Sequence, residues 1–165
     1  MRLFLGTFAD IDNLDEIEKS FSKIVEGKWV EKHNIHLTYI FLGNVEDPKK
    51  IILRLKDIKY KKKTINIRGL DYFGRPPKIL YAKIDDKEIK KIYEDICKRL
   101  GIEIDDNFIS HITLVRIKKV KGIKRFLETV ERFKNRKLGI LKLKLALIKS
   151  ELTPKGPKYT VIKEF

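Results

Sequence analysis

Two copies of a His-x-Thr motif are the residues in this chain best suited to chemistry. They are His36-Leu37-Thr38 and His111-Ile112-Thr113, and they lie 75 residues apart. The chain has three histidines and seven threonines, so chance would produce both motifs with odds of about one in 200. An imidazole titrates near neutral pH, and a threonine hydroxyl donates hydrogen bonds to phosphate oxygens. Two such pairs facing each other suit displacement at phosphorus, because one imidazole can take a proton while the other gives one.

The apolar pattern around the motifs repeats at the same offset. Before the motif, the helical positions Leu14, Ile17, Phe21 and Val25 recur as Ile89, Ile92, Ile96 and Leu100. After it, Ile51, Ile52, Leu55 and Ile58 recur as Phe126, Leu127, Val130 and Phe133, and Ile65, Leu70 and Tyr72 recur as Ile140, Leu145 and Leu147. One apolar pattern in two halves indicates a duplicated unit that presents one His and one Thr from each half.

Local patterns predict strands and helices in the same order in both halves. We expect strands over residues 3–8, 35–42, 64–73, 79–84, 108–117, 138–152 and 159–165, and helices from Asn13 to about Val25, from Asp47 to about Ile58, from Asp85 to Gly101 and over about 123–134. Gly74-Arg75-Pro76-Pro77 predicts a turn. The expected fold is α+β, with two lobes related by a pseudo-twofold axis, mostly antiparallel sheets, helices on the outer faces and a central cleft. No linker separates the halves, so residues 1–165 are predicted to form a single domain.

Strand alternation predicts which side chains face the cleft. Residues two apart in a strand point the same way, so each motif His shares a face with its Thr. Leu37, Tyr39 and Phe41 would then point to the other face, as contacts for the helices. The same alternation places Arg116 opposite Thr113, which leaves Arg116 out of the expected site.

Other kinds of site find little support in the sequence. The motif histidines have no Cys or carboxylate at a metal-ligand spacing, so we expect no metal. No phosphate-binding glycine loop or dinucleotide motif is present, so no cofactor is expected. His33 lies outside the repeat, where its counterpart is Phe108, and is predicted to be structural or exposed. Cys97 is the only cysteine, which excludes an internal disulfide and suggests a small core residue.

The charge of the chain is strongly positive and unevenly distributed. The net charge is +15, and residues 116–165 hold 16 Lys and Arg against 4 Asp and Glu. Such asymmetry favours a polyanionic partner such as RNA, with Lys118, Lys119 and Lys121 as candidates for holding it. The lack of Gln and the wealth of Lys, Ile and Glu resemble proteins from hot environments. The apolar start is too short for a signal peptide or a membrane span, which predicts a cytoplasmic protein without membrane association.

These motifs resemble the 2H phosphoesterase superfamily, which is named for two His-x-Thr/Ser motifs. Within it the chain is similar to the RNA 2′,3′-cyclic phosphodiesterases, historically called 2′-5′ RNA ligases. The segments that carry the resemblance are Arg2-Leu3-Phe4, residues 29–43, residues 108–116 and residues 150–159. Ser110 departs from the family pattern, because many members have Pro before the second histidine.

The resemblance implies a bilobal fold whose cleft acts without a required metal, with His36 as proton donor and His111 as proton acceptor. Arg116 and Tyr159 would be plausible substrate contacts, but neither enters the predicted site. We therefore expect a monomeric enzyme that hydrolyses RNA 2′,3′-cyclic phosphate ends, with tRNA fragments as candidate substrates, to the 2′-phosphomonoester. Thr38 and Thr113 would hold the phosphate. The alternatives are a reversible 2′-5′ ligase of tRNA halves and a non-catalytic RNA-binding module.

Overall fold

The computed structural model describes residues 1–165, with four α-helices and eleven strands. The helices are α1 (Leu14–Phe21), α2 (Lys49–Leu55), α3 (Lys87–Leu100) and α4 (Ile123–Arg132), and η1 (Lys32–Asn34) is a 3-10 turn. The strands are β1 (Arg2–Phe8), β2 (Asp10–Ile11), β3 (Val25–Trp29), β4 (His36–Asn44), β5 (Thr64–Arg68), β6 (Leu70–Phe73), β7 (Ile79–Lys83), β8 (His111–Val120), β9 (Lys137–Lys142), β10 (Ala146–Thr153) and β11 (Gly156–Glu164). None of the helices is long and apolar enough to cross a membrane.

The strands form two sheets in which every pair is antiparallel. The larger sheet has the order β11-β10-β1-β4-β8-β7-β6, and β3 pairs with β8 beside it. The smaller sheet has the order β2-β9-β5. This arrangement confirms the predicted α+β class with mostly antiparallel sheets.

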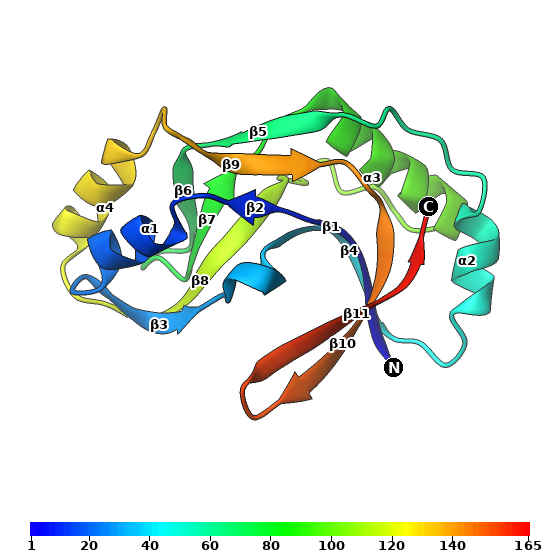
Figure 1. The fold of residues 1–165 in the computed structure, drawn as a ribbon, viewed down its shortest axis with the longest axis horizontal. Coiled ribbons are helices and arrows are strands. Elements are labelled where there is room, and N and C mark those ends of the chain that lie inside the picture. Colours follow the sequence, from blue (N-terminus) through cyan, green and yellow to red (C-terminus); the bar gives the residue numbers. More distant parts are fainter.

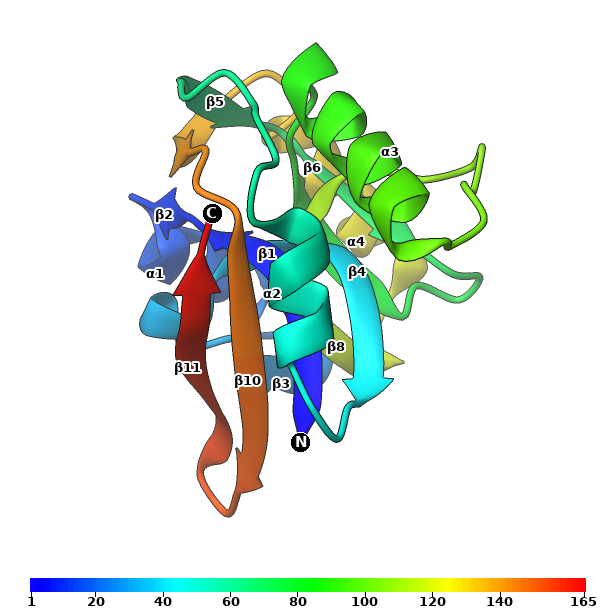
Figure 2. The ribbon, with the colours of Figure 1, turned by 90° about the vertical axis from the view of Figure 1, so that its right-hand side faces the viewer.

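The larger sheet is nearly divided at its centre. Strands β1 and β4 pair along the whole of β1, whereas β4 and β8 pair only at Leu37 and Ile112. Figure 1 shows α1 and α4 together at one end of the molecule and α2 and α3 at the other. Viewed from that second end, α2 lies in front of β1, between β10 and β4, with α3 beside it (Figure 2). The helices thus cover the outer faces of two parts of the sheet whose central strands, β4 and β8, are paired at one residue pair.

The sequence repeat recurs as a structural repeat in which strands are exchanged. At an offset of 75 residues β1 corresponds to β7, α1 to α3, β4 to β8, α2 to α4, β5 to β9 and β6 to β10. Strand β10, from the second half, pairs with β1, and β6, from the first half, pairs with β7. Each end of the larger sheet therefore contains strands from both halves of the chain. Strand β11 has no counterpart in the first half.

Two of the predicted strands are broken in the structure. The expected strand 64–73 is divided at Gly69, which adopts a left-handed φ of +84°. A Cβ at this position would meet the Lys134 carbonyl oxygen at 2.4 Å, so only glycine fits the bend. The expected strand 138–152 is divided at the equivalent place, between β9 and β10. In both halves the break sends the first piece to the small sheet and the second piece to the large one.

The first helix was predicted too long. It ends at Phe21, where the Ile24 amide closes a turn on the Phe21 carbonyl, and Val25 already begins β3. Strand β3 pairs with the part of β8 that β4 leaves without a neighbour. Gly27 permits this pairing, because a Cβ there would lie 2.3 Å from the Arg116 carbonyl oxygen.

Helix capping agrees with the sequence in part. Asp86, not the predicted Asp85, caps α3 by accepting a hydrogen bond from the Glu88 amide at 2.9 Å. Gly101 ends this helix in the left-handed conformation, as predicted. Asp47 accepts a hydrogen bond from the Lys49 amide at the start of α2, whereas Asn13 makes no side-chain cap on α1.

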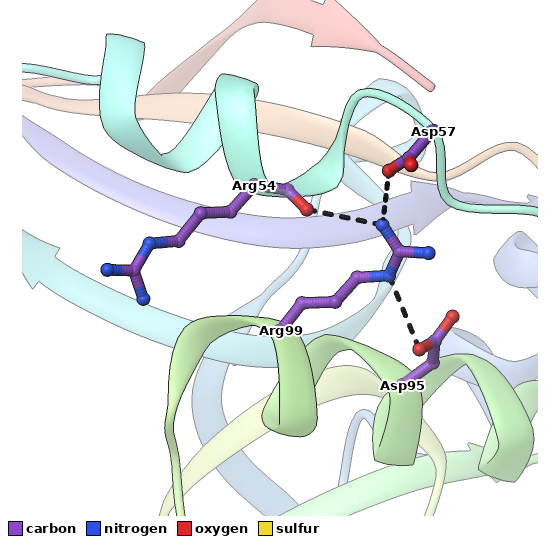
Figure 3. A network of polar contacts seen from close by, with 4 residues as sticks. All are labelled: Arg54, Asp57, Asp95 and Arg99. Atoms are coloured by element: carbon purple, nitrogen blue, oxygen red, sulfur yellow. Dashed lines mark hydrogen bonds and ion pairs between the residues drawn. The ribbon is translucent and has the colours of Figure 1, made fainter.

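One arginine joins α2 to α3 across the two halves of the chain. The Arg99 guanidinium donates to the Asp57 carboxylate at 2.5 Å and to the Arg54 carbonyl at 3.3 Å. Its Nε donates to Asp95 on its own helix at 3.3 Å (Figure 3). The Arg54 carbonyl belongs to the last turn of α2, where helical carbonyls lack intrahelical partners. Arg99 therefore both closes the end of α2 and links it to its neighbour.

We predict that Arg99→Met lowers the melting temperature by about 2 °C or more, because it removes these contacts while it keeps the aliphatic stem. Arg54→Met is the matched control, since only the backbone of Arg54 takes part and its side chain points away from the network (Figure 3). Calorimetry of both variants gives the comparison. Equal melting temperatures would contradict the linking role of Arg99.

Candidate active site

The four motif side chains are brought together by the single pair that joins β4 to β8. Leu37 and Ile112 are both fully buried, so their side chains point into the core. One step along these antiparallel strands places His36 beside Thr113 and Thr38 beside His111. All four motif residues are half-buried and share the face opposite the core. The structure thus brings together every predicted site residue.

Both motif imidazoles are held by the same kind of hydrogen bond. His36 Nδ1 lies 2.6 Å from the Asn34 carbonyl oxygen, and His111 Nδ1 lies 2.8 Å from the Ile109 carbonyl oxygen. A carbonyl can only accept, so Nδ1 carries the hydrogen in each neutral ring. Nε2 is then the atom that can accept or donate a proton in the cleft.

Aromatic side chains surround His36. Its ring centroid lies 4.9 Å from that of Phe4, 5.1 Å from that of Tyr159 and 6.4 Å from that of Phe8. Burial among these rings is the main cause that lowers the pKa of His36 below its ordinary value. The positive charges of Arg116 and His111 lower this pKa further, while the bond to the Asn34 carbonyl partly opposes the shift.

The surroundings of His111 are different. Its ring lies 5.0 Å from Phe73 and 5.4 Å from Tyr81, and these two rings stack on each other at 4.3 Å. Tyr81 stands in β7 where its counterpart in β1 is Gly6. The two halves therefore repeat the motif and its hydrogen bonds but differ in the rings around each histidine.

Arg116 faces the cleft, which corrects the alternation argument. The register between β7 and β8 shifts at Leu114, and Leu114 and Val115 are both buried in succession. This β-bulge turns the following residue back to the face of Thr113. From this face the positive charge of Arg116 lowers the pKa of His36, and it opposes the burial that raises the pKa of Tyr159.

An equivalent bulge acts in the first half. The pairing of β4 with β1 skips Tyr39, and the side chain of Phe41 is 71% exposed rather than packed under a helix. Its ring lies 6.1 Å from Phe4. Phe41 and Arg116 occupy equivalent positions at the offset of 75 residues, so the repeat itself carried a signal that both share one face.

Tyr159 was also left out of the predicted site, although it packs edge-on against the ring of His36. It belongs to β11, outside the repeat, so no repeated pattern pointed to it. His33 lies apart from the motif pair, as expected. Its side chain is 71% exposed, and its Nε2 lies 3.4 Å from the Glu31 carboxylate.

Comparison with known proteins identifies the family of the chain. The model of the LigT-like phosphoesterase family matches the chain twice, over residues 8–81 and 86–159, once for each half. The chain belongs to this family. It is 32% identical to the RNA 2′,3′-cyclic phosphodiesterase of Methanocaldococcus jannaschii, with 100% of each chain covered.

Solved structures show the same fold. A protein of Thermus thermophilus superposes with a TM-score of 0.76 at 27% identity, covering 100% of this chain and 97% of that one. Escherichia coli LigT, solved in complex with 3′-AMP, superposes with a TM-score of 0.74 at 18% identity, covering 99% of this chain and 96% of that one. The expected membership of the 2H phosphoesterases is therefore confirmed, and the chain is a phosphoesterase.

We predict that Arg116→Met raises the pKa of His36. The guanidinium disfavours a second positive charge nearby, so its removal makes the imidazolium easier to form. NMR titration of the imidazole signals measures the change. Arg125→Met, on the outer helix α4, removes the same charge as a control and should leave His36 unchanged. An unchanged or lowered pKa in Arg116→Met would contradict the proximity of the two groups.

Proposed function

We propose that this phosphoesterase hydrolyses 2′,3′-cyclic phosphate ends of RNA to 2′-phosphomonoesters. The observation that supports this most directly is the pair of imidazoles, each with Nδ1 fixed by a carbonyl and Nε2 free, on either side of one residue pair. A cyclic phosphodiester suits this pair, because its leaving oxygen stays attached to the ribose. The name of the Methanocaldococcus relative and the 3′-AMP bound by LigT agree with such a substrate.

In the proposed reaction the proton donor and acceptor are separate. His111 Nε2 takes a proton from water while the water oxygen forms the new bond to phosphorus. The bond from phosphorus to the 3′-oxygen breaks, and His36 Nε2 gives its proton to that oxygen. The product is a 2′-phosphate, and exchange of protons with solvent restores both imidazoles. This assignment of the two roles rests on the family resemblance, since the halves are nearly symmetric.

Three further side chains would hold the phosphate. The Thr38 and Thr113 hydroxyls lie on the cleft face and would donate to the non-bridging oxygens, where negative charge accumulates. The Arg116 guanidinium would add a positive charge at the same place. A bound phosphate also favours protonation of His36, which opposes the effect of burial on its pKa. Reaction without a metal or cofactor is part of this proposal.

A non-catalytic RNA-binding role is disfavoured, because the chain belongs to a phosphoesterase family. Ligation of tRNA halves through a 2′-5′ linkage remains a prediction, as do the monomeric state, the cytoplasmic location and tRNA fragments as the natural substrate. Incubation of a 2′,3′-cyclic phosphate RNA with a 5′-hydroxyl RNA would reveal ligation as a longer product.

We predict that His36→Ala and His111→Ala each lose about 10²- to 10⁴-fold in kcat, because each removes one proton-transfer group. His33→Ala is the matched control and should keep its kcat at saturating RNA, since its side chain is exposed, lies beside Glu31 and is outside the motif pair. The assay follows an end-labelled RNA with a 2′,3′-cyclic phosphate in the presence of EDTA. Release of a 3′-phosphate would reverse the roles of the histidines, and loss of activity in EDTA with recovery in zinc would refute the mechanism.

The two histidine variants should also have opposite pH profiles. The residual kcat/KM of His111→Ala depends on protonated His36, so it should fall with rising pH. The midpoint should lie below the ordinary imidazole value, because burial lowers the pKa of His36. The residual kcat/KM of His36→Ala depends on neutral His111 and should rise with pH. Profiles that slope the other way would exchange the donor and the acceptor.

A further inference from the structure

A polar groove lies next to the aromatic residues that surround His36. It has a volume of about 360 Å³ and lies between η1 and the hairpin formed by β10 and β11. We call it the hairpin groove; its lining includes Phe8, His33, Asn34, Lys155, Lys158 and Tyr159. Phe8 and Tyr159 also contact the ring of His36, and the Asn34 carbonyl binds its Nδ1. The groove is therefore continuous with the catalytic cleft.

The two sides of the groove are tied together. The Asn34 side chain donates to the Pro157 carbonyl at 3.0 Å, which connects η1 to the hairpin. Thr153 caps the hairpin turn by donating to the Gly156 carbonyl oxygen. Gly156, with φ of +117°, brings the turn close to Lys28, whose Nζ would lie 3.6 Å from a Cβ at this position. These contacts hold the two walls of the groove against each other.

The charge of the groove suits a phosphate. Lys155 and Lys158 are exposed on the hairpin, and Lys28 approaches from β3. The one carboxylate in the lining belongs to Glu31, which lies beside His33 at 3.4 Å. Lysine side chains along a groove, with aromatic rings at its inner end, are features that bind single-stranded nucleic acid.

One wall of the hairpin groove has no equivalent on the other side of the site. It depends on β11, the strand that has no counterpart in the other half. Around His111 the equivalent space is bordered by β6 and β7, with Phe73 and Tyr81 against the imidazole. A terminal cyclic phosphate is likewise one-sided, because the rest of the RNA continues only from the 5′ side of the last ribose. The two motifs are nearly symmetric, but the hairpin groove beside His36 has side chains that suit an RNA chain leading to the terminal ribose.

We propose that the hairpin groove binds the nucleotide that precedes the terminal one, with its phosphate on Lys155 and Lys158. This inference rests on the proposed function and adds to it the path of the RNA. Binding in the groove places the terminal ribose in one orientation between the two histidines. A cyclic mononucleotide has no preceding nucleotide, so it would use the catalytic cleft without the groove.

The test compares two substrates that share the terminal nucleotide: a short single-stranded RNA ending in a 2′,3′-cyclic phosphate, and the cyclic mononucleotide itself. The double variant Lys155→Glu/Lys158→Glu should lower kcat/KM for the RNA by about 10-fold or more at low salt. Its kcat/KM for the mononucleotide should stay within about twofold of the parent. Lys91→Glu/Lys98→Glu, on the outer face of α3, makes the same change in net charge as a control.

Three results would overturn the inference. Equal losses with both substrates would mean that the hairpin acts through the catalytic cleft. An equal loss in kcat/KM for the RNA in the groove and α3 variants would show that net charge alone causes the loss. The third result concerns the variant Lys118→Glu/Lys119→Glu/Lys121→Glu. If this variant, and not the groove variant, lost kcat/KM selectively for the RNA, the RNA chain would lie along β8.

Failure of the proposed function gives a separate result. In that case the parent protein hydrolyses neither substrate. Fluorescence anisotropy with the same labelled RNA then tests the groove independently, because the groove variant should bind it about 10-fold more weakly than the α3 variant. Equal binding by the two variants would overturn the inference without reference to catalysis.

Discussion

The pair formed by Leu37 and Ile112 is the constraint on which the site depends. It is the one place where β4 and β8 are joined, and both side chains are fully buried. Because side chains alternate along a strand, burial of these two residues turns their four neighbours outward together. No loop has to be positioned for this purpose. The reacting groups stand at the starts of two strands, β4 and β8, which pair from their histidines onward with β1 and β7.

Around this pair, the two halves differ in ways that matter for proton transfer. Equivalent carbonyls fix the two imidazoles in the same tautomer. Burial among Phe4, Phe8 and Tyr159 makes His36 harder to protonate in the free protein. Symmetry of the backbone thus supplies two imidazoles with the same hydrogen bond, and the packing around His36 lowers the pKa of that imidazole.

Much of the fold and the site could be predicted from the sequence. The repeated motif and the apolar pattern at the same offset identified His36, His111 and their threonines, because period and residue type are local properties. The bulges at Tyr39 and Leu114 could not be read from alternation, since a bulge depends on how the neighbouring strand pairs. For this reason Arg116 was placed on the wrong face.

The same limit explains the other errors. Strand β3 forms because β8 extends beyond β4, which is a property of the sheet and not of residues 25–29. Gly69 divides one predicted strand because the chain must pass from one sheet to the other there. Tyr159 lies far from the motifs in sequence and reaches His36 only through the order of strands in the sheet.

The exchange of strands between the halves has a consequence for the history of the fold. A chain with only one repeat would hold β1 and β4 but would have to obtain the neighbour of β1 from a second copy, as β10 supplies it here. Two identical copies that exchanged this strand would form a closed twofold dimer, with one histidine from each subunit at the axis. The present chain has the architecture of such a dimer joined end to end. In a single chain the two halves need not be identical, and β11 follows only the second of them.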